Sequence, residues 1–238
     1  IGFQPDIVWF KNRSTTDSHS FYDSVRGATK RLKSDTNDVE STQSNGLTAF
    51  GTDGFTVGDH GGVNGNGNNI VSWNWRAGGA APTQTYKVVV VSDSGNKYRF
   101  RNSADTATFG TSAVTLDLQE GGTYTFDVSD STVNSHPFVL GTSSGVDGSY
   151  STGVTYKLDG VTKTYSQYTS GFSSATSRQL IITVAASAPT LYYNCSVHSG
   201  MGGAINTNAT FGSSNFAGNI QSLVSANTTA GISIVRYT

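Results

Sequence analysis

Short stretches of alternating apolar and polar residues recur along the chain, and this periodicity constrains the fold more than any other feature. Residues 70–75 and 124–128 alternate with a period of two, which is typical of strands with one buried face. No window of useful length keeps apolar residues at the spacing of an amphipathic helix. The pattern therefore predicts an all-β protein. The strands expected on this basis are residues 6–11, 70–75, 86–91, 98–100, 114–118, 124–128, 180–184, 190–193 and 232–237.

Glycine-rich stretches divide this pattern into parts. Residues 78–82 (Gly-Gly-Ala-Ala-Pro) are typical of a linker, and a second junction lies near residues 202–204. We expect one β-sandwich over residues 83–203, between the two junctions. Residues 204–238 are too few to fold alone, so we expect them to form a second sandwich with residues 1–80. In one alternative this second sandwich is completed by a neighbouring repeat or copy.

The last predicted strand needs a partner. Residues 232–237 are apolar enough that an isolated edge strand of this sequence would be an aggregation hazard. We expect this strand to join a sheet that contains residues 7–11, either of the same chain or of the next copy along a fibre.

Composition and charge argue against several classes of partner. Charged residues make up 13% of the 238 residues and the net charge is −1, without a basic stripe, so we expect no nucleic-acid partner. No apolar run is long enough for a membrane-spanning helix, so we expect no membrane span. A single cysteine allows no internal disulfide, although the polar, glycine-rich composition is typical of extracellular proteins. We therefore expect a protein that folds in a reducing cytoplasm and works outside it.

The only cysteine and the only methionine lie in one short segment with a histidine between them. Cys195, His198 and Met201 follow the spacing C-x-x-H-x-x-M, and His136 follows the predicted strand 124–128 of the same module. Two imidazoles, a thiolate and a distant thioether form the ligand set of a blue-copper site, because the soft sulfur favours copper and imidazole suits both of its oxidation states. The sequence thus indicates copper as a candidate cofactor with these four residues as ligands.

This arrangement resembles the cupredoxin family, in which the last strand delivers the cysteine, a short loop delivers histidine and methionine, and an upstream histidine completes the set. The resemblance covers residues 86–203 and implies a Greek-key sandwich. Two alternatives stay open, namely a chance cluster and a cupredoxin-like building block that binds no metal. Asn194-Cys195-Ser196 also matches a glycosylation sequon. A glycan there would collide with the site, which argues against a eukaryotic secreted origin.

Segments outside this module carry a second pattern, which runs Gly-Phe-Gln-Pro-Asp-Ile-Val-Trp-Phe from residue 2, Ser-Trp-Asn-Trp-Arg-Ala-Gly-Gly from residue 72 and Ser-Ala-Asn-Thr-Thr-Ala-Gly-Ile from residue 225. It resembles a module of tail and fibre proteins of marine bacteriophages, including cyanophages, that is similar to the jelly-roll sandwich of concanavalin A-like lectins. The resemblance implies a structural virion protein of a tail fibre, capsid fibre or other surface appendage. Such a protein folds in the bacterial host cytoplasm and ends on the virion surface. Its partners would be further copies in a homo-oligomer, neighbouring virion proteins and host-surface glycans.

Four residues of the first module are candidates for glycan contacts. Trp73 and Trp75 share one strand face and could stack on sugar rings, although such a pair more often fills a core. Trp9 lies in an apolar run and is expected in the core. His60 and Asn66 lie in a loop rich in Gly and Asn, where solvated turns are the alternative to a binding role.

Catalytic signatures are missing from the sequence. It contains no nucleophile elbow, no zinc-protease helix and no phosphate-binding loop, and its carboxylates are dispersed without a supported pairing. We therefore predict a structural or adhesive protein and not an enzyme. The alternative function is that of a copper-binding redox protein of the cupredoxin type.

Overall fold

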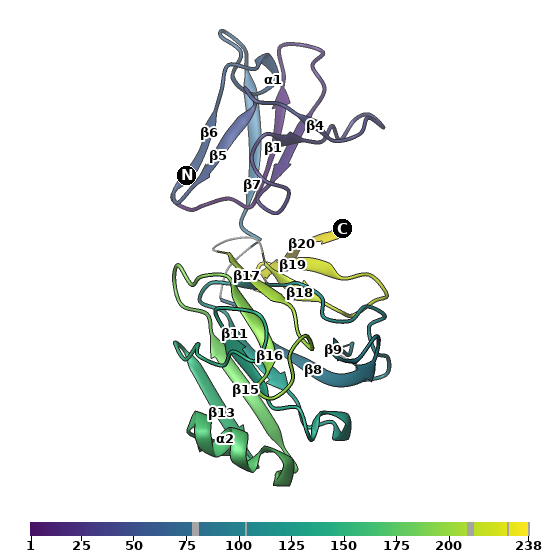
Figure 1. Cartoon of the computed structure of the whole chain (residues 1–238). Helices are drawn as coiled ribbons and strands as arrows, with labels where there is room; N and C mark the ends of the chain where they lie inside the picture. Colours follow the sequence, from purple (N-terminus) through teal and green to yellow (C-terminus); the bar gives the residue numbers. More distant parts are fainter. Residues whose placement is uncertain (78–80, 103, 209–211, 228, 238) are drawn as a thin grey trace. The chain divides into compact units, whose positions relative to one another are not determined.

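The computed structural model describes residues 1–77, 81–102, 104–208, 212–227 and 229–237 (Figure 1). Strands make up 43% of the structure and helices 7%, so the prediction of an all-β sandwich protein is confirmed. The chain forms two compact units: unit 1 contains residues 1–80 and 224–236, and unit 2 contains residues 81–223 and 237–238. Residues 78–80 of the expected linker lie outside the described residues. No helix in the described part of the chain is long and apolar enough to cross a membrane.

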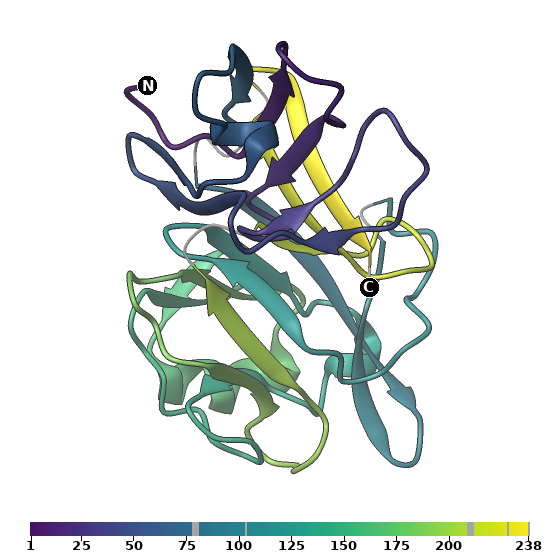
Figure 2. The same cartoon turned by 90° about the horizontal axis from the view of Figure 1, so that it is seen from above.

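Unit 1 is built around a three-stranded antiparallel sheet in the order β2-β1-β7. A hairpin of β5 and β6, a short β3–β4 pair and the single turn of α1, which lies beside β1 (Figure 2), complete its N-terminal part. The elements are β1 (Ile7–Asn12), β2 (Ser20–Asp23), β3 (Lys30–Arg31), β4 (Ser41–Thr42), β5 (Leu47–Gly51), β6 (Gly54–Val57), α1 (Gly61–Asn64) and β7 (Ile70–Trp75).

The core of unit 1 follows from the alternation along β1. Val8 and Phe10 point inward and are buried together with Tyr22 and Leu47. The hairpin covers this inner face, because the ring of Phe55 on β6 meets the ring of Phe10 edge-on at 5.4 Å between centroids.

The outer face of the same sheet carries tryptophans. Trp9 pairs with Trp73 in the β1–β7 register, and their ring centroids lie 5.2 Å apart. Both rings face away from the Val8–Phe10 side, and Trp73 is 43% exposed. The expectation that Trp9 fills the core is therefore wrong, because the period-two alternation gives the inner face to its two neighbours.

Unit 2 contains most of the strands and a short helix that sequence periodicity did not predict. Its elements are β8 (Thr83–Ser92), β9 (Asn96–Phe100), β10 (Leu116–Gln119), β11 (Thr123–Asp127), η1 (Ser131–Val133), β12 (Phe138–Gly141), β13 (Val154–Leu158), β14 (Val161–Lys163), α2 (Tyr165–Gly171), η2 (Phe172–Ser174), β15 (Arg178–Thr183), β16 (Leu191–Cys195), β17 (Ala204–Asn208) and β18 (Ser213–Asn215). Helix α2 packs on β13 (Figure 1), where the rings of Tyr156 and Tyr168 lie 4.7 Å apart.

Two sheets enclose the core of unit 2. One has six strands in the order β14-β13-β15-β11-β8-β9, and the other has four in the order β10-β17-β16-β12. Inward-facing aromatic side chains from both sheets meet between them, as the stacked rings of Phe126 on β11 and Phe138 on β12 show, with centroids 4.8 Å apart. The site described below lies at one end of this core.

The four-stranded sheet shows that this module ends later in the chain than the sequence predicts. The sequence division assigned residues 204–238 to the first module, but β17 pairs in parallel with β10, as Leu116 with Ile205, and antiparallel with β16, as Leu191 with Ile205. Ile205 is fully buried in the unit 2 core. Residues 204–223 therefore belong to unit 2, and the glycine pair before them lies within the sandwich, where the Gly203 carbonyl accepts the backbone N–H of Tyr193.

Strand β20 (Ile232–Tyr237) pairs with β19 (Ser222–Asn227) in a sheet of the order β18-β19-β20. The neighbours of β1 are β2 and β7. The prediction that residues 232–237 join the sheet that contains residues 7–11 is therefore wrong within the described part of one chain, because β1 lies in the β2-β1-β7 sheet and β20 lies in another. Joining the sheet of a further copy stays a prediction.

Candidate metal centre

The candidate ligands come from one end of two neighbouring strands of the four-stranded sheet, β16 and the edge strand β12. Cys195 is the last residue of β16, and its register partner on β12 is Phe138. His136 precedes β12 by two residues, so the antiparallel pairing of these strands brings His136 and Cys195 to the same end of the sheet. His198 follows Cys195 by three residues, in the loop that leaves β16.

Three of the four candidate ligands converge. The Sγ atom of Cys195 lies 3.5 Å from Nδ1 of His198 and 4.0 Å from Nδ1 of His136, and the two Nδ1 atoms are 3.1 Å apart. Among the described residues, these form the only group of three or more His, Cys, Asp or Glu side chains with ligand atoms close enough to share a metal ion.

These separations fit one ion with thiolate and imidazole ligands. Metal–nitrogen bonds of about 2.0 Å and metal–sulfur bonds of about 2.3 Å, at trigonal to tetrahedral angles, place nitrogens roughly 3.3–3.6 Å apart and sulfur roughly 3.5–3.8 Å from nitrogen. The observed sulfur–nitrogen distances of 3.5 and 4.0 Å span the expected range, and the nitrogen–nitrogen distance of 3.1 Å is slightly shorter than expected. Small side-chain rotations would thus complete the coordination without backbone movement.

The loop that carries His198 is tied to its surroundings at both ends. Ser196 donates its backbone N–H to the carbonyl of Pro137 at 2.9 Å, and Tyr98 donates its backbone N–H to the carbonyl of Met201 at 2.9 Å. In addition, Lys97 Nζ donates to the carbonyl of Gly200. These contacts fix the loop against β9 and against the entry to β12, so the ligand positions are set before any ion binds.

The three converging side chains differ in their exposure to solvent. Cys195 is fully buried and His136 is 8% exposed, whereas His198 is exposed. Burial, followed by the nearby His198 ring, lowers the pKa of His136. Two ring nitrogens at 3.1 Å repel each other when both carry protons, so the geometry favours the neutral, ligating form of His136.

The outer nitrogen of His136 also has a neighbour. The side-chain nitrogen of Asn96 lies 3.4 Å from His136 Nε2. With Nδ1 on a metal, Nε2 carries the ring proton and would donate it to the Asn96 amide oxygen after a flip of that amide. Such an outer contact fixes the orientation and tautomer of a ligating histidine.

Met201 and Asn194 flank the cluster. Met201 is 2% exposed and belongs to the same buried cluster as Cys195, which is compatible with a distant thioether ligand. The sequon residue Asn194 is 3% exposed, and its amide donates to the carbonyls of Ser143 at 2.9 Å and Asp147 at 2.8 Å. The folded protein therefore holds this asparagine inside, where a glycan has no room.

Residues 1–186 match a protein family described as a domain of unknown function, DUF7483. This match covers most of the chain. The chain belongs to the DUF7483 family. The matched span includes parts of both units and His136, and it ends before Cys195. Neither the curated proteins nor the solved structures contain a match to this DUF7483 chain.

The glycan candidates of the DUF7483 chain do not gather at one place. The His60 ring caps α1 by accepting the Gly62 N–H at 3.1 Å, and burial lowers the pKa of His60. Asn66 is an exposed turn residue beyond α1. This loop lies at the Ile70 end of β7, because Asn12, the partner of Ile70, donates to the Gly61 carbonyl. Trp75 lies at the opposite end of that strand, and exposed Trp73 lies between.

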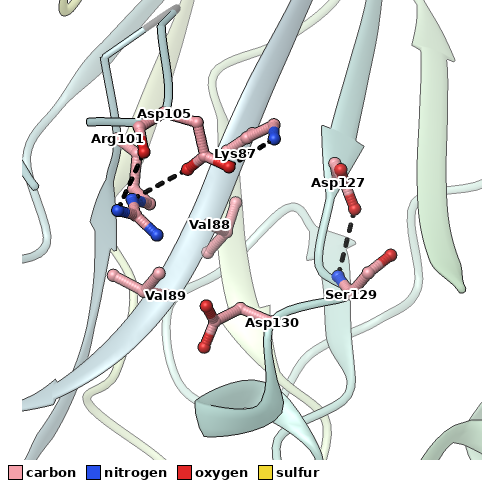
Figure 3. Close-up of a pocket in the computed structure, with 8 residues that line it drawn as sticks. All are labelled: Lys87, Val88, Val89, Arg101, Asp105, Asp127, Ser129 and Asp130. Carbon is pink, nitrogen blue, oxygen red and sulfur yellow. Dashed lines mark hydrogen bonds and ion pairs between the residues drawn. The ribbon is translucent and has the colours of Figure 1, made fainter. Parts of the chain in front are cut away.

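Unit 2 of the DUF7483 chain also has a polar pocket of about 230 Å³ (Figure 3). Its charged groups are largely paired. Asp105 contacts Lys87 at 2.6 Å and Arg101 at 2.9 Å, while Asp127 accepts the backbone N–H of Ser129. The hydrogen bond from Lys87 holds the pKa of Asp105 below its ordinary range, so Asp105 stays ionised at neutral pH.

Proposed function

We propose that this chain is a structural virion protein of a bacteriophage surface appendage whose second unit binds copper in a cupredoxin-like site. The convergence of His136, Cys195 and His198 within hydrogen-bonding distances supports the metal site. The all-β architecture and the resemblance of the flanking segments to phage fibre modules support the structural role. In this proposal the chain acts by assembling and binding, not as an enzyme.

The residues of the site have separate tasks in this proposal. Cys195 would supply the thiolate, His136 and His198 would supply Nδ1 atoms, and Met201 would supply a thioether sulfur as a weaker ligand. A bound copper ion would provide one-electron redox chemistry. The buried side of the site excludes water from Cys195, while exposed His198 gives the ion a way in. Binding requires loss of the thiol proton, so the affinity falls as the pH is lowered.

Titration of the purified full chain with Cu(II) tests the metal site. We expect one equivalent to bind with a visible thiolate-to-copper absorption band. Cys195→Ser should abolish the band while circular dichroism stays unchanged, because the unit 2 core does not depend on the ion. His60→Ala in unit 1 serves as the matched control and should leave the band intact. Absence of binding by the wild-type chain would reject the copper site.

The structural role is tested on particles. Mass spectrometry of purified virions should detect this chain in stoichiometric amounts, and gold-labelled antibodies should decorate a surface appendage. Detection only in the soluble lysate of infected cells would contradict a virion role, whatever the outcome of the copper titration.

Adhesion to host glycans is a second candidate function, favoured by one observation. Trp73 is 43% exposed on the outer face of the β2-β1-β7 sheet, with the Trp9 ring beside it. Exposed indole faces stack on sugar rings and have little other reason to face water. Binding on a glycan array that disappears in Trp73→Ala, but persists in His60→Ala, would support this role.

A further inference from the structure

Arg178 is a buried arginine with an unusual set of partners. It is the first residue of β15 and is 2% exposed. None of the ion pairs found among the described residues involves it. Its guanidinium lies over the ring of Phe172, 5.1 Å from the centroid. The hydrogen-bond acceptors of its guanidinium are oxygens of one chain segment.

That segment is residues 128–134, between β11 and β12. Arg178 Nε donates to the carbonyl of Val128 at 3.1 Å, and Nη2 donates to the carbonyls of Ser129 at 2.7 Å and Asp130 at 3.1 Å. Nη1 donates to Oδ1 of Asn134. One planar fork thus holds both ends of the segment, which no other side chain can do with the same geometry.

The segment leads directly to the first metal-ligand candidate. The backbone N–H of His136 donates to the carbonyl of Val133 at 2.8 Å, inside the clamped stretch. On its other side, the hydroxyl of Tyr98 donates to the carbonyl of His136 at 2.8 Å. The main chain of His136 is therefore placed by the segment that Arg178 holds, and its Nδ1 atom reaches the ligand cluster from there.

We propose that Arg178 is a positioning residue that sets the place of His136 in the ligand cluster; this inference rests on the proposed copper site. A buried cation without an ion pair is a poor device for stability alone, since apolar residues of similar volume often stabilise a core as well. The planar guanidinium instead fixes the shape of the segment, because its four directional hydrogen bonds hold residues 128–134 in one conformation.

The test compares Arg178→Lys with Ile182→Ala in the full chain. The lysine keeps the charge but loses the fork. Ile182 lies on the same strand, fully buried, and its register partners are Tyr124 and Val154, outside the clamped segment. Two readouts are taken under conditions where each variant is folded: Cu(II) affinity, and the ring NMR resonances of His136 in the metal-free protein.

We expect Arg178→Lys to lose about tenfold or more in Cu(II) affinity, the range found for groups that orient ligands. We also expect shifted or broadened His136 resonances, while Ile182→Ala keeps wild-type values of both. Unchanged affinity and unchanged resonances in Arg178→Lys would overturn the proposal, as would equal losses in Ile182→Ala.

Two further outcomes are informative. If the wild-type chain takes up no copper, the proposed metal site fails, and the His136 resonances of the metal-free variants still decide whether Arg178 positions this ring. If Arg178→Lys does not fold, Asn134→Ala takes its place, because it removes one contact of the clamp from the segment side. Wild-type His136 resonances in Asn134→Ala would then reject the proposal.

Discussion

The two units differ in how much apolar side chain they bury. In unit 2, 28 buried residues of the described chain form one cluster, whereas the N-terminal cluster of unit 1 has five. Unit 2 encloses its core between two sheets, and unit 1 covers one face of a three-stranded sheet and leaves tryptophans on the other. The ligand cluster lies in unit 2, where packing can hold side chains within the tolerance that metal coordination demands.

The sharpest test of this comparison is removal of one ring from the larger core. Phe126 is fully buried and its ring lies 4.8 Å from Phe138 and 5.5 Å from Tyr86. Phe126→Ala should lower the free energy of unfolding of unit 2 by about 3–5 kcal/mol. In chemical denaturation, the transition of unit 2 should move while that of unit 1 stays in place. A single transition that moves as a whole would show that the units unfold together.

Copper should stabilise only the unit that carries the ligands. At a free Cu(II) concentration of about 100 times Kd, binding to the folded state adds about 2.7 kcal/mol. We expect the unit 2 transition to rise by this amount and to return to its metal-free position in Cys195→Ser. Differential scanning calorimetry with and without chelator measures the effect. An equal rise of both transitions would contradict a site confined to unit 2.

A smaller effect concerns the loop beside the site. Hydrogen bonds from Ser149, through its side chain and then its backbone, and from the backbone of Ser143 and Thr142 hold the pKa of Asp147 well below its ordinary range. Because the folded pKa is lowered, this stabilisation is present above pH about 4 and disappears as the pH falls below it. Asp147→Asn should cost about 1 kcal/mol at pH 7, after allowance for solvent screening.

The pH dependence separates this carboxylate from a general packing defect. The difference in unfolding free energy between wild type and Asp147→Asn should be constant above pH about 5 and should shrink progressively as the pH is lowered below about 4, toward the lowered pKa of the folded state. Urea titrations at several pH values measure it. A difference that is constant with pH would mean that the loop depends on the shape of the side chain and not on its charge.

An equally small effect is expected on the open face of unit 1. Trp73→Ala removes a half-exposed ring and its contact with Trp9, so the unit 1 transition should fall by about 1 kcal/mol. A loss of unfolding free energy as large as that expected for Phe126→Ala would show that this face is covered in the assembled protein.

Much of the fold was predictable because period-two alternation marks half-buried strands directly. β7 and β20 begin and end where the sequence placed them. Helix α2 was missed because a seven-residue helix is too short for a 3.6-residue period. Its capping box, Thr164 with Gln167, was a readable signal. β17 was assigned to the wrong module, because a glycine pair in the sequence does not distinguish a linker between two modules from a connection within one.

The site was predictable in part for a similar reason. The spacing of Cys195, His198 and Met201 is local in sequence, and the ligand chemistry selected His136 from few histidines. Arg178 could not be found this way, because its partners lie far along the chain and are mostly backbone carbonyls. The outer position of Trp9 required the strand register, which an apolar run of several residues does not reveal.

The parallel pairing of β10 with β17 has a consequence for synthesis of the chain. β10 leaves the ribosome early, but its partner in the four-stranded sheet becomes available only when residue 208 has emerged. Until then the nascent chain exposes an unpaired strand edge together with much of an aromatic-rich interior, which invites association with other nascent chains. Pairing between strands that lie far apart in the sequence also forms slowly. We expect the yield of soluble protein to depend on the translation rate between β10 and β17, and a codon-slowed stretch in this interval to change it more than the same stretch placed before β8.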